Sequence, residues 1–332
     1  EAMTNGVVAA DSDLKVIMTN SAARQVLGIG WSAVGQSLFV ATGKQELESF
    51  FKRTMEGTNK ISEEITLSYG FGVTRQKKIL RIRGSRLRQN GVTTGAVAVL
   101  EDITELKHLE NIRTEFAANV SHELKTPLTA ISGYAELIAS GMTSGEDTIH
   151  FATEIHKSAE RLQYLINDII KLSELDSDDT KIEFETLDLH EMALNCQAMM
   201  EIPAEKNEVT VEVQGDSAEI RGNRNLIDEL IYNLCSNAVR YNKKGGKVTI
   251  MTGTENGHPT LTVKDTGIGI PKEAQKRVFE RFYRVDKSRS KSTGGTGLGL
   301  AIVKHIVAQH EAQISLESEE GVGTEIKVVF LK

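Results

Sequence analysis

Apolar residues at helical spacing constrain the middle of this chain more than any other feature. Between residues 103 and 140 the sequence contains no glycine or proline before Pro127. The apolar positions follow one another at steps of four and three, so they form one stripe along an α-helix. These positions are Phe116, Val120, Leu124, Leu128 and Ile131. The sequence therefore predicts a single helix about 58 Å long at ~1.5 Å per residue.

The polar segment SHELKTP, residues 121–127, lies inside this predicted helix. At about 100° per residue, His122 points away from the apolar stripe, and Thr126 lies one turn further along the same open face. Pro127 has no N–H, so the carbonyl of Glu123 loses its helical partner and we expect a bend there. These seven residues alone leave two interpretations of His122 open: an ordinary solvated histidine, or a reactive imidazole on an accessible face.

A second helix is predicted after a loop at residues 141–145, because apolar residues again recur at steps of three and four from Ile149 to Leu172. Two helices with one apolar stripe each cannot bury both stripes well as an isolated hairpin. The usual solution is a second copy, which completes a four-helix bundle. We therefore expect an antiparallel helical hairpin that forms a homodimer through residues 103–178, followed by a polar linker at residues 176–180.

Composition excludes several classes of protein. The chain has 332 residues, enough for two or three domains, and its net charge of −7 argues against general nucleic-acid binding. Cys196 and Cys235 both fall in apolar helical patterns, so two reduced core thiols are expected rather than a disulfide. No apolar run reaches ~18 residues and no signal peptide is visible. Because the chain begins at Glu1 rather than Met, we expect it to be a piece of a longer protein.

The first hundred residues alternate short strands and helices. A strand pair is predicted at residues 6–10 and 15–19, followed by a helix that Asn20 or Ser21 caps. Later, residues 78–87 alternate as a half-buried strand, and Asn90-Gly91 indicates a hairpin turn into a strand at residues 94–100. Together with the ending Asp102-Ile103-Thr104, this order resembles a PAS sensor domain, here residues 1–102.

The same region limits what such a sensor could bind. No histidine precedes His108 and no cysteine precedes Cys196, so a haem-ligating histidine and a flavin-trapping cysteine are both missing. We expect a small-molecule or protein signal instead. The basic run at residues 75–88 either contacts an anionic surface or is a solvated strand face, and the second is favoured because strand faces away from a core are normally charged.

From residue 181 to the end, strands and helices alternate, which predicts an α/β layered domain. The expected helices are residues 187–206, 224–241 and 299–309. The expected strands are residues 208–213, 247–252, 260–264, 312–317 and 324–330.

Four separated motifs in this last domain carry chemistry. On the predicted helix 224–241, Asn233, Asn237 and Arg240-Tyr241 share one face, which suits Mg²⁺, phosphate and a base ring. Asp265 ends a strand before Gly267 and Gly269; its carboxylate can accept the amine of adenine while the glycines let backbone approach the ring. The motif Gly295-Thr296-Gly297-Leu298-Gly299 opens a helix, where backbone N–H groups attract phosphate. A fourth glycine turn covers residues 321–324. Each motif alone is weak evidence for a nucleotide site. All four in this order, in the same chain as residues 121–127, are stronger evidence.

The chain resembles the sensor histidine kinases of bacterial two-component systems, in particular the PAS-containing group of phosphate-regulon and cell-wall sensors. Residues 116–127 are similar to the H box of that family, 233–241 to its N box, 265–269 and 295–299 to its glycine boxes, and 278–284 to its F box, which includes Arg284. The resemblance implies a multidomain α+β architecture: PAS domain, dimeric helical hairpin (103–178), and an ATP-binding sandwich of the GHKL type (181–332). It also implies that residues 285–294 form a lid. A further implication is that the chain is the cytoplasmic portion of a protein in the cell membrane. Glu311 stands where the family often has glycine, which concerns helix termination.

By this resemblance, ATP would phosphorylate His122, and the phosphoryl group would then pass to an aspartate of a response regulator receiver. Glu123 would accept or orient the ring proton, and Thr126 would serve dephosphorylation of the regulator. The implied nucleotide ligands are Asn233, Asn237, Arg240, Tyr241, Asp265, Gly267, Gly269, Arg284, Gly295, Thr296, Gly297, Leu298 and Gly299, with Asn237 and Asn233 holding Mg²⁺. The alternative is a GHKL ATPase or serine kinase that acts on a partner protein and needs no phosphohistidine.

Overall fold

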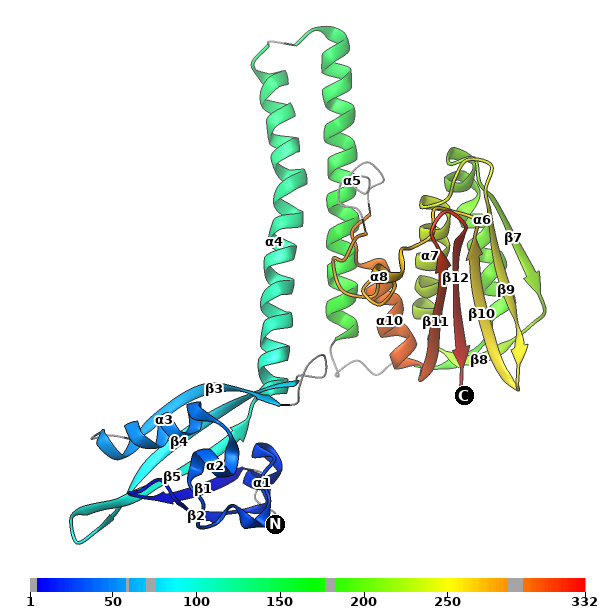
Figure 1. Cartoon of the computed structure of the whole chain (residues 1–332). Helices are drawn as coiled ribbons and strands as arrows, with labels where there is room; N and C mark the ends of the chain where they lie inside the picture. The colour runs from blue at the N-terminus through cyan, green and yellow to red at the C-terminus, as the bar shows by residue number, and fades with distance from the viewer. Residues whose placement is uncertain are drawn as a thin grey trace. The chain divides into compact units, whose positions relative to one another are not determined.

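The structure, a computed structural model, describes residues 5–57, 60–69, 76–141, 143–176, 183–285 and 295–331. The chain divides into two compact units, Glu1–Ala117 and Ala118–Lys332 (Figure 1). The border lies inside one long helix, α4. The predicted helical hairpin and ATP-binding region fall into the same unit, and the three-domain division stays a prediction.

An antiparallel five-stranded sheet forms the centre of the N-terminal unit, in the order β2-β1-β5-β4-β3. Three short helices, with a 3₁₀ turn at Trp31–Ala33, connect the second and third strands along the chain. The strands are β1 Gly6–Asp11, β2 Val16–Thr19, β3 Ile61–Tyr69, β4 Gln76–Gln89 and β5 Val92–Asp102, and the helices α1 Ser21–Leu27, α2 Leu38–Thr42 and α3 Gln45–Glu56.

Local signals read from the sequence set several of these elements. The Asn20 side chain accepts a hydrogen bond from Ala23 N–H at 2.8 Å, so the predicted cap of α1 is confirmed. Asn90 and Gly91 both have positive φ, as the turn between β4 and β5 requires. The core is closed: Leu47, Phe50 and Phe51 of α3 are fully buried against the sheet.

Three basic residues of strand β4, Lys78, Arg81 and Arg83, pair with carboxylates of the neighbouring strands. Arg81 lies 3.4 Å from Glu64 on β3 and 3.5 Å from Glu101 on β5, and Arg83 also approaches Glu101. These cross-strand pairs favour a solvated outer face over an anion-binding surface.

Two long antiparallel helices follow, α4 Thr104–Ala139 and α5 Gly145–Leu175. Helix α4 continues through Pro127, and with 36 residues it is about 54 Å long at ~1.5 Å per residue. Ser144 and Asp147 form a capping box at the start of α5. The expected bend at Pro127 stays a prediction.

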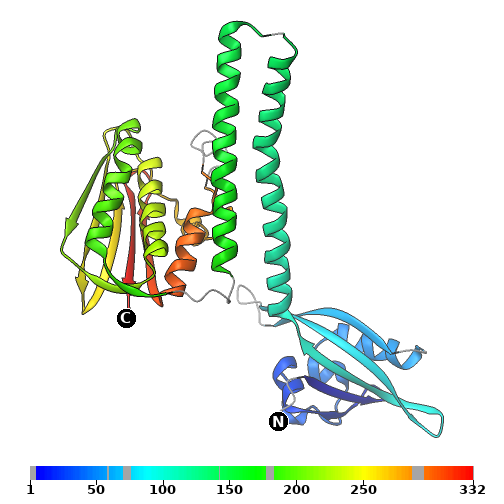
Figure 2. The same cartoon turned by 180° about the vertical axis from the view of Figure 1, so that it is seen from behind.

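The C-terminal part is an α/β sandwich, as predicted. Its five-stranded sheet has the order β11-β12-β10-β9-β7, in which only β7 and β9 are parallel. Helices α6 and α7 cover one face of this sheet (Figures 1 and 2). The strands are β7 Thr210–Gly215, β9 Lys247–Glu255, β10 His258–Asp265, β11 Ala312–Glu319 and β12 Gly323–Phe330; the main helices are α6 Leu189–Lys206, α7 Arg224–Arg240 and α10 Gly299–Gln309.

Three short elements escaped prediction: the two-stranded sheet of β6 Glu185–Asp188 with β8 Glu219–Gly222, and the single turn α8 Lys272–Gln275. Segments of four residues are too short for hydrophobic periodicity to show.

Candidate functional site

His122 projects from α4 into solvent, with 81% of its side chain exposed. The Thr126 hydroxyl donates to the His122 carbonyl at 3.2 Å, so Thr126 lies one turn along the same helix face as predicted. Nδ1 of His122 lies 3.9 Å from Oε1 of Glu123, a near contact that exceeds hydrogen-bond distance. The imidazole is therefore accessible to an incoming group.

Glu123 is held by two arginines. Arg161 of α5 donates to Oε2 of Glu123 at 3.2 Å, across the hairpin. Nη1 of Arg284 lies 3.9 Å from the same oxygen. The residue beside His122 is thus linked both to the second helix and to the segment predicted as the F box. Sequence reasoning did not find Arg161, because its partner lies 38 positions away.

Arg284 is the most unusual charged residue of this region. Its side chain is only 8% exposed, and its Nε and Nη2 have no hydrogen-bond partner among the described residues. Burial and the nearby Arg161 lower the pKa of this guanidinium. Buried, unpaired donors are costly, so the geometry favours an anion as the missing partner.

Helix α7 presents the predicted amide face. The Nδ2 group of Asn233 donates to Oε1 of Glu229 at 2.8 Å, which fixes the amide and leaves its oxygen unused by that bond. This oxygen would lie 2.6 Å from a Cβ atom placed on Gly299, and the Asn237 amide lies near the same point. The N box and the second glycine box are therefore in direct contact, and a larger residue at position 299 would displace the Asn233 amide.

The C-terminal end of α7 contacts the start of the glycine loop at residues 295–299. A Cβ atom on Gly295 would lie 2.9 Å from the Tyr241 hydroxyl and 3.5 Å from Nη1 of Arg240. Gly297 has φ +76° and packs against Phe282. The remaining loop residue, Leu298, is fully buried as the N-cap of α10.

Asp265 closes the site from the sheet. It is the last residue of β10, and its Oδ1 accepts hydrogen bonds from Gly267 N–H at 2.7 Å and Thr324 N–H at 3.2 Å. Burial raises the pKa of this carboxyl group. Gly267 packs against the Tyr241 carbonyl, so the first glycine box contacts the end of α7. Gly269 has φ +68°, where side chains are strained.

Apart from Gly269, which packs against Glu319, and Arg284, which approaches Glu123, the predicted nucleotide residues lie along α7 and the loops that touch it. Of the predicted lid, residues 285–294, all but Val285 lie outside the described residues. Within the described ranges, no group of three or more His, Cys, Asp or Glu side chains could hold a metal ion. In the same ranges no helix is both long and apolar enough to cross a bilayer. Cys196 and Cys235 are free and buried, in agreement with the prediction.

Comparison with known proteins decides the family. Residues 112–178 match the family model of the His Kinase A (phospho-acceptor) domain, and residues 222–332 match the histidine kinase-, DNA gyrase B- and HSP90-like ATPase. The sensor protein kinase WalK of Staphylococcus aureus is 30% identical over 332 residues, covering 99% of this chain and 78% of that protein. This chain belongs to the sensor histidine kinases.

Other relatives agree with this membership. WalK of Bacillus subtilis is 33% identical over 337 residues, covering 98% of this chain and 53% of its own length. The sensor kinase chain therefore spans about half the length of that curated relative. A solved structure of the histidine kinase ThkA in complex with the response regulator TrrA shares the fold, with TM-score 0.54, 21% identity and 99% of this chain covered.

The hairpin of this sensor kinase also contacts the ATP-binding region through polar groups. The Thr296 hydroxyl donates to Oδ2 of Asp168 on α5 at 2.7 Å. Lys171 pairs with Glu229, and Arg281 donates to both carboxylate oxygens of Asp176 at 2.8 Å. None of Asp168, Lys171 and Asp176 was predicted as part of the site, because no short motif marks them.

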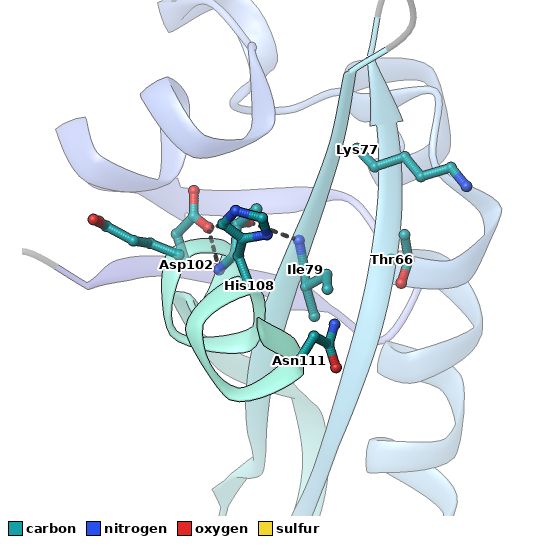
Figure 3. Close-up of a pocket in the computed structure, with 8 residues that line it drawn as sticks. Thr66, Lys77, Ile79, Asp102, His108 and Asn111 are labelled. Carbon is teal, nitrogen blue, oxygen red and sulfur yellow. Dashed lines mark hydrogen bonds between the residues drawn. The ribbon is translucent and has the colours of Figure 1, made fainter. Parts of the chain in front are cut away.

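A groove of about 920 Å³ lies in the N-terminal unit, where α4 begins beside the sheet. Figure 3 shows His108 and Asn111 projecting from the first turns of α4 beside strand β4, which carries Lys77 and Ile79. Thr104 joins the two parts, because its hydroxyl accepts from Ile79 N–H at 2.9 Å. The other lining residues are Thr66, Asp102 and Glu105. The predicted Asp-Ile-Thr ending thus anchors α4 to the sheet.

Proposed function

We propose that this chain phosphorylates His122 with ATP and passes the phosphoryl group to an aspartate of a response regulator receiver. The observation that carries the proposal is the approach of Arg284, a residue of the predicted F box, to Glu123, the neighbour of the exposed His122. The shared fold with a kinase that was solved with its response regulator supports a receiver as the partner.

The reaction uses the neutral imidazole as nucleophile. Because Glu123 lies on the Nδ1 side of the ring, Nε2 is the nitrogen left to attack. A bond forms between Nε2 and the γ-phosphorus, and the bond from that phosphorus to the β,γ-bridging oxygen breaks, releasing ADP. The ring proton passes to or is shared with Glu123 or solvent. Positioning and charge neutralisation supply most of the catalysis, and the buried Arg284 is placed to neutralise transferring oxygens.

The nucleotide itself would occupy the surface between α7 and the glycine loops. Tyr241 and Asp265 would hold adenine, since Asp265 keeps its Oδ2 for an exocyclic amine while Oδ1 binds backbone. Arg240 would pair with the phosphates through its positive charge. The N–H groups of residues 295–299 would also bind phosphate, because this loop leads into the N-terminus of the 11-residue helix α10.

The amide oxygens of Asn233 and Asn237 fit Mg²⁺, a hard cation that prefers oxygen ligands. Glu229 fixes the Asn233 amide through its nitrogen, which leaves the oxygen as the ligand atom. When bound, the ion would neutralise charge on the β- and γ-phosphates.

We also propose that the N-terminal unit is a PAS-type sensor for a small molecule or protein signal. The five-stranded antiparallel order and the anchoring of α4 by Thr104 support this. The kinase would act as a homodimer through residues 103–178, on the cytoplasmic side of a membrane where ATP and receivers occur. If deletion of residues 1–102 leaves kinase activity and its ligand response unchanged, the coupling is refuted.

Incubation with γ-labelled ATP tests the central proposal. We expect label that is labile in acid and stable in base, absent from His122→Gln and reduced at least 100-fold in Asp265→Asn, which should still fold. Label that persists in His122→Gln and resists acid would instead indicate a serine kinase of the same ATPase fold. Transfer to candidate receivers identifies the partner.

A phosphatase activity on that receiver is a separate proposal that rests on Thr126. Its hydroxyl is one turn from His122 and can orient water toward an aspartyl phosphate. Thr126→Ala should slow receiver dephosphorylation at least tenfold and leave autophosphorylation intact, whereas Thr126→Ser should retain it.

A further inference from the structure

Asp168 is a carboxylate on the hairpin that binds directly to the predicted phosphate loop. Its Oδ2 accepts the Thr296 hydroxyl at 2.7 Å, and Thr296 Oγ1 also accepts Leu298 N–H at 3.2 Å. Thr296 is thus bonded at the start of α10, where backbone N–H groups would bind phosphate. A carboxylate of the protein is therefore bonded to the loop at which the phosphate charges of the nucleotide are expected.

The surroundings of Asp168 make a negative charge on this carboxyl group costly. Desolvation raises the pKa of Asp168, and the neighbouring Glu229 adds a second negative charge. Lys171 and Arg240 oppose these effects, but Lys171 is already paired with Glu229. A triphosphate bound at this loop would lie near a half-buried carboxylate that solvent screens only partly.

The position of Asp168 along the hairpin adds a second argument. Arg161 of α5 marks the level of Glu123 and hence of His122, because these side chains are bonded across the hairpin. Asp168 lies seven residues further along α5, about 10 Å at ~1.5 Å per residue. The Asp168–Thr296 bond therefore holds the phosphate loop about two helical turns from the level of the phosphoacceptor.

We infer that Asp168 is a positioning residue that competes with nucleotide phosphate for the glycine loop, so that ATP binding releases the loop from α5. Since coupling is reciprocal, the α5-bound arrangement lowers the affinity for ATP by the same factor by which ATP weakens that arrangement. The inference rests on the proposed nucleotide site.

Asp168→Asn tests this directly, because the amide keeps an acceptor for Thr296 and removes the charge. Equilibrium binding of a non-hydrolysable ATP analogue with Mg²⁺ to the whole chain should tighten about fivefold to tenfold, the size expected of one partly screened charge at short range. ADP should gain less, and adenosine should be unchanged. A purely structural role would shift all three ligands alike.

Asp176→Asn is the matched control, since it removes a carboxylate charge at the C-cap of α5, where Asp176 binds Arg281 away from the loop. Its affinity for the ATP analogue should change less than twofold. Hydrogen exchange of residues 165–176 should rise when the analogue binds the wild type, and rise less in Asp168→Asn.

Two results overturn the inference: unchanged or weaker ATP binding in Asp168→Asn, or an equal gain in Asp176→Asn. If the wild-type chain binds no ATP analogue, the proposed nucleotide site fails as well. If the wild type binds and only the Asp168 effect is missing, the proposed function stands and this inference alone is rejected.

Discussion

Helix α3 of the N-terminal unit has 12 residues and buries four side chains, whereas α4 has 36 residues and buries only Pro127. Helix α5 has 31 residues and buries two. Exposed apolar side chains recur along the hairpin, such as Leu128 at 55% and Ile149 at 70% exposure. The sheet unit closes its own core, and the hairpin leaves its apolar surface open.

The difference shows that an apolar pattern at helical spacing predicts a helix but does not say whether the same chain buries its apolar face. A helix packed on a sheet finds a second layer within its own chain. A two-helix hairpin has no second layer on its far side, so its apolar stripe is buried only when another pair of helices packs against it. The predicted homodimer supplies them, and the following predictions test this contrast.

Phe50→Ala should have the largest effect, because the ring is fully buried in the closed core. We expect the N-terminal unit to lose about 3–5 kcal/mol of unfolding free energy. Fluorescence of Trp31, the only tryptophan, reports on this unit during urea unfolding. The loss should not depend on protein concentration; a loss below about 1 kcal/mol would show that this core is not closed.

Leu128→Asp should act through the open surface instead. If a second hairpin buries Leu128, the change removes about 1.5–3 kcal/mol of burial per subunit and adds a desolvated charge, so the dimer dissociation constant should rise at least ~100-fold. Analytical ultracentrifugation measures this. The exposed neighbour Thr129→Asp is the control and should change dimerisation little. An equal rise of the dissociation constant in both variants would contradict the idea that the apolar stripe of the hairpin is the dimer surface.

The ATP-binding region, like the N-terminal unit, buries side chains within its own chain, and His310 at the end of α10 is an example. His310 is buried, accepts Asn223 N–H at Nε2 (3.1 Å), and its Nδ1 lies 2.8 Å from the Ile306 carbonyl. Burial lowers the pKa of His310 below the ordinary 6.5. The folded state thus prefers neutral His310, whose stabilising effect is complete above about pH 6.5 and is lost as the pH falls toward the folded pKa.

Calorimetric melting of the wild type should therefore show Tm falling as the pH is lowered from about 7.5 to 5.5, and His310→Gln should flatten that slope. The pKa of His305 is also lowered, so only the difference between the two proteins reports on His310. An identical slope in both proteins would contradict the assignment.

Glu311→Gly should have the smallest effect, and a stabilising one. Glu311 has φ +49°, the left-handed conformation in which glycine is unstrained. We expect a gain of about 0.5–1 kcal/mol in the same calorimetric transition. Glu317→Gly, in the extended strand β11, should instead destabilise by a similar amount.

The sequence by itself determined the long helices, most strands of both sheets and the residues of the nucleotide motifs. Hydrophobic period, capping residues and glycine turns are local signals, and α10, at Gly299–Gln309, begins and ends at its predicted residues. The placement of the site residues on α7 and its loops also followed from local spacing, and their roles stay predictions.

Only the tertiary structure decided which distant side chains meet. The bonds of Glu123 to Arg161 and of Asp168 to Thr296 join residues 38 and 128 positions apart. No periodicity or motif encodes such pairs, because they depend on how two helices and a sandwich pack and on which charges burial leaves without water. The physical reason is that local pattern sets a residue's face, and packing sets its partner.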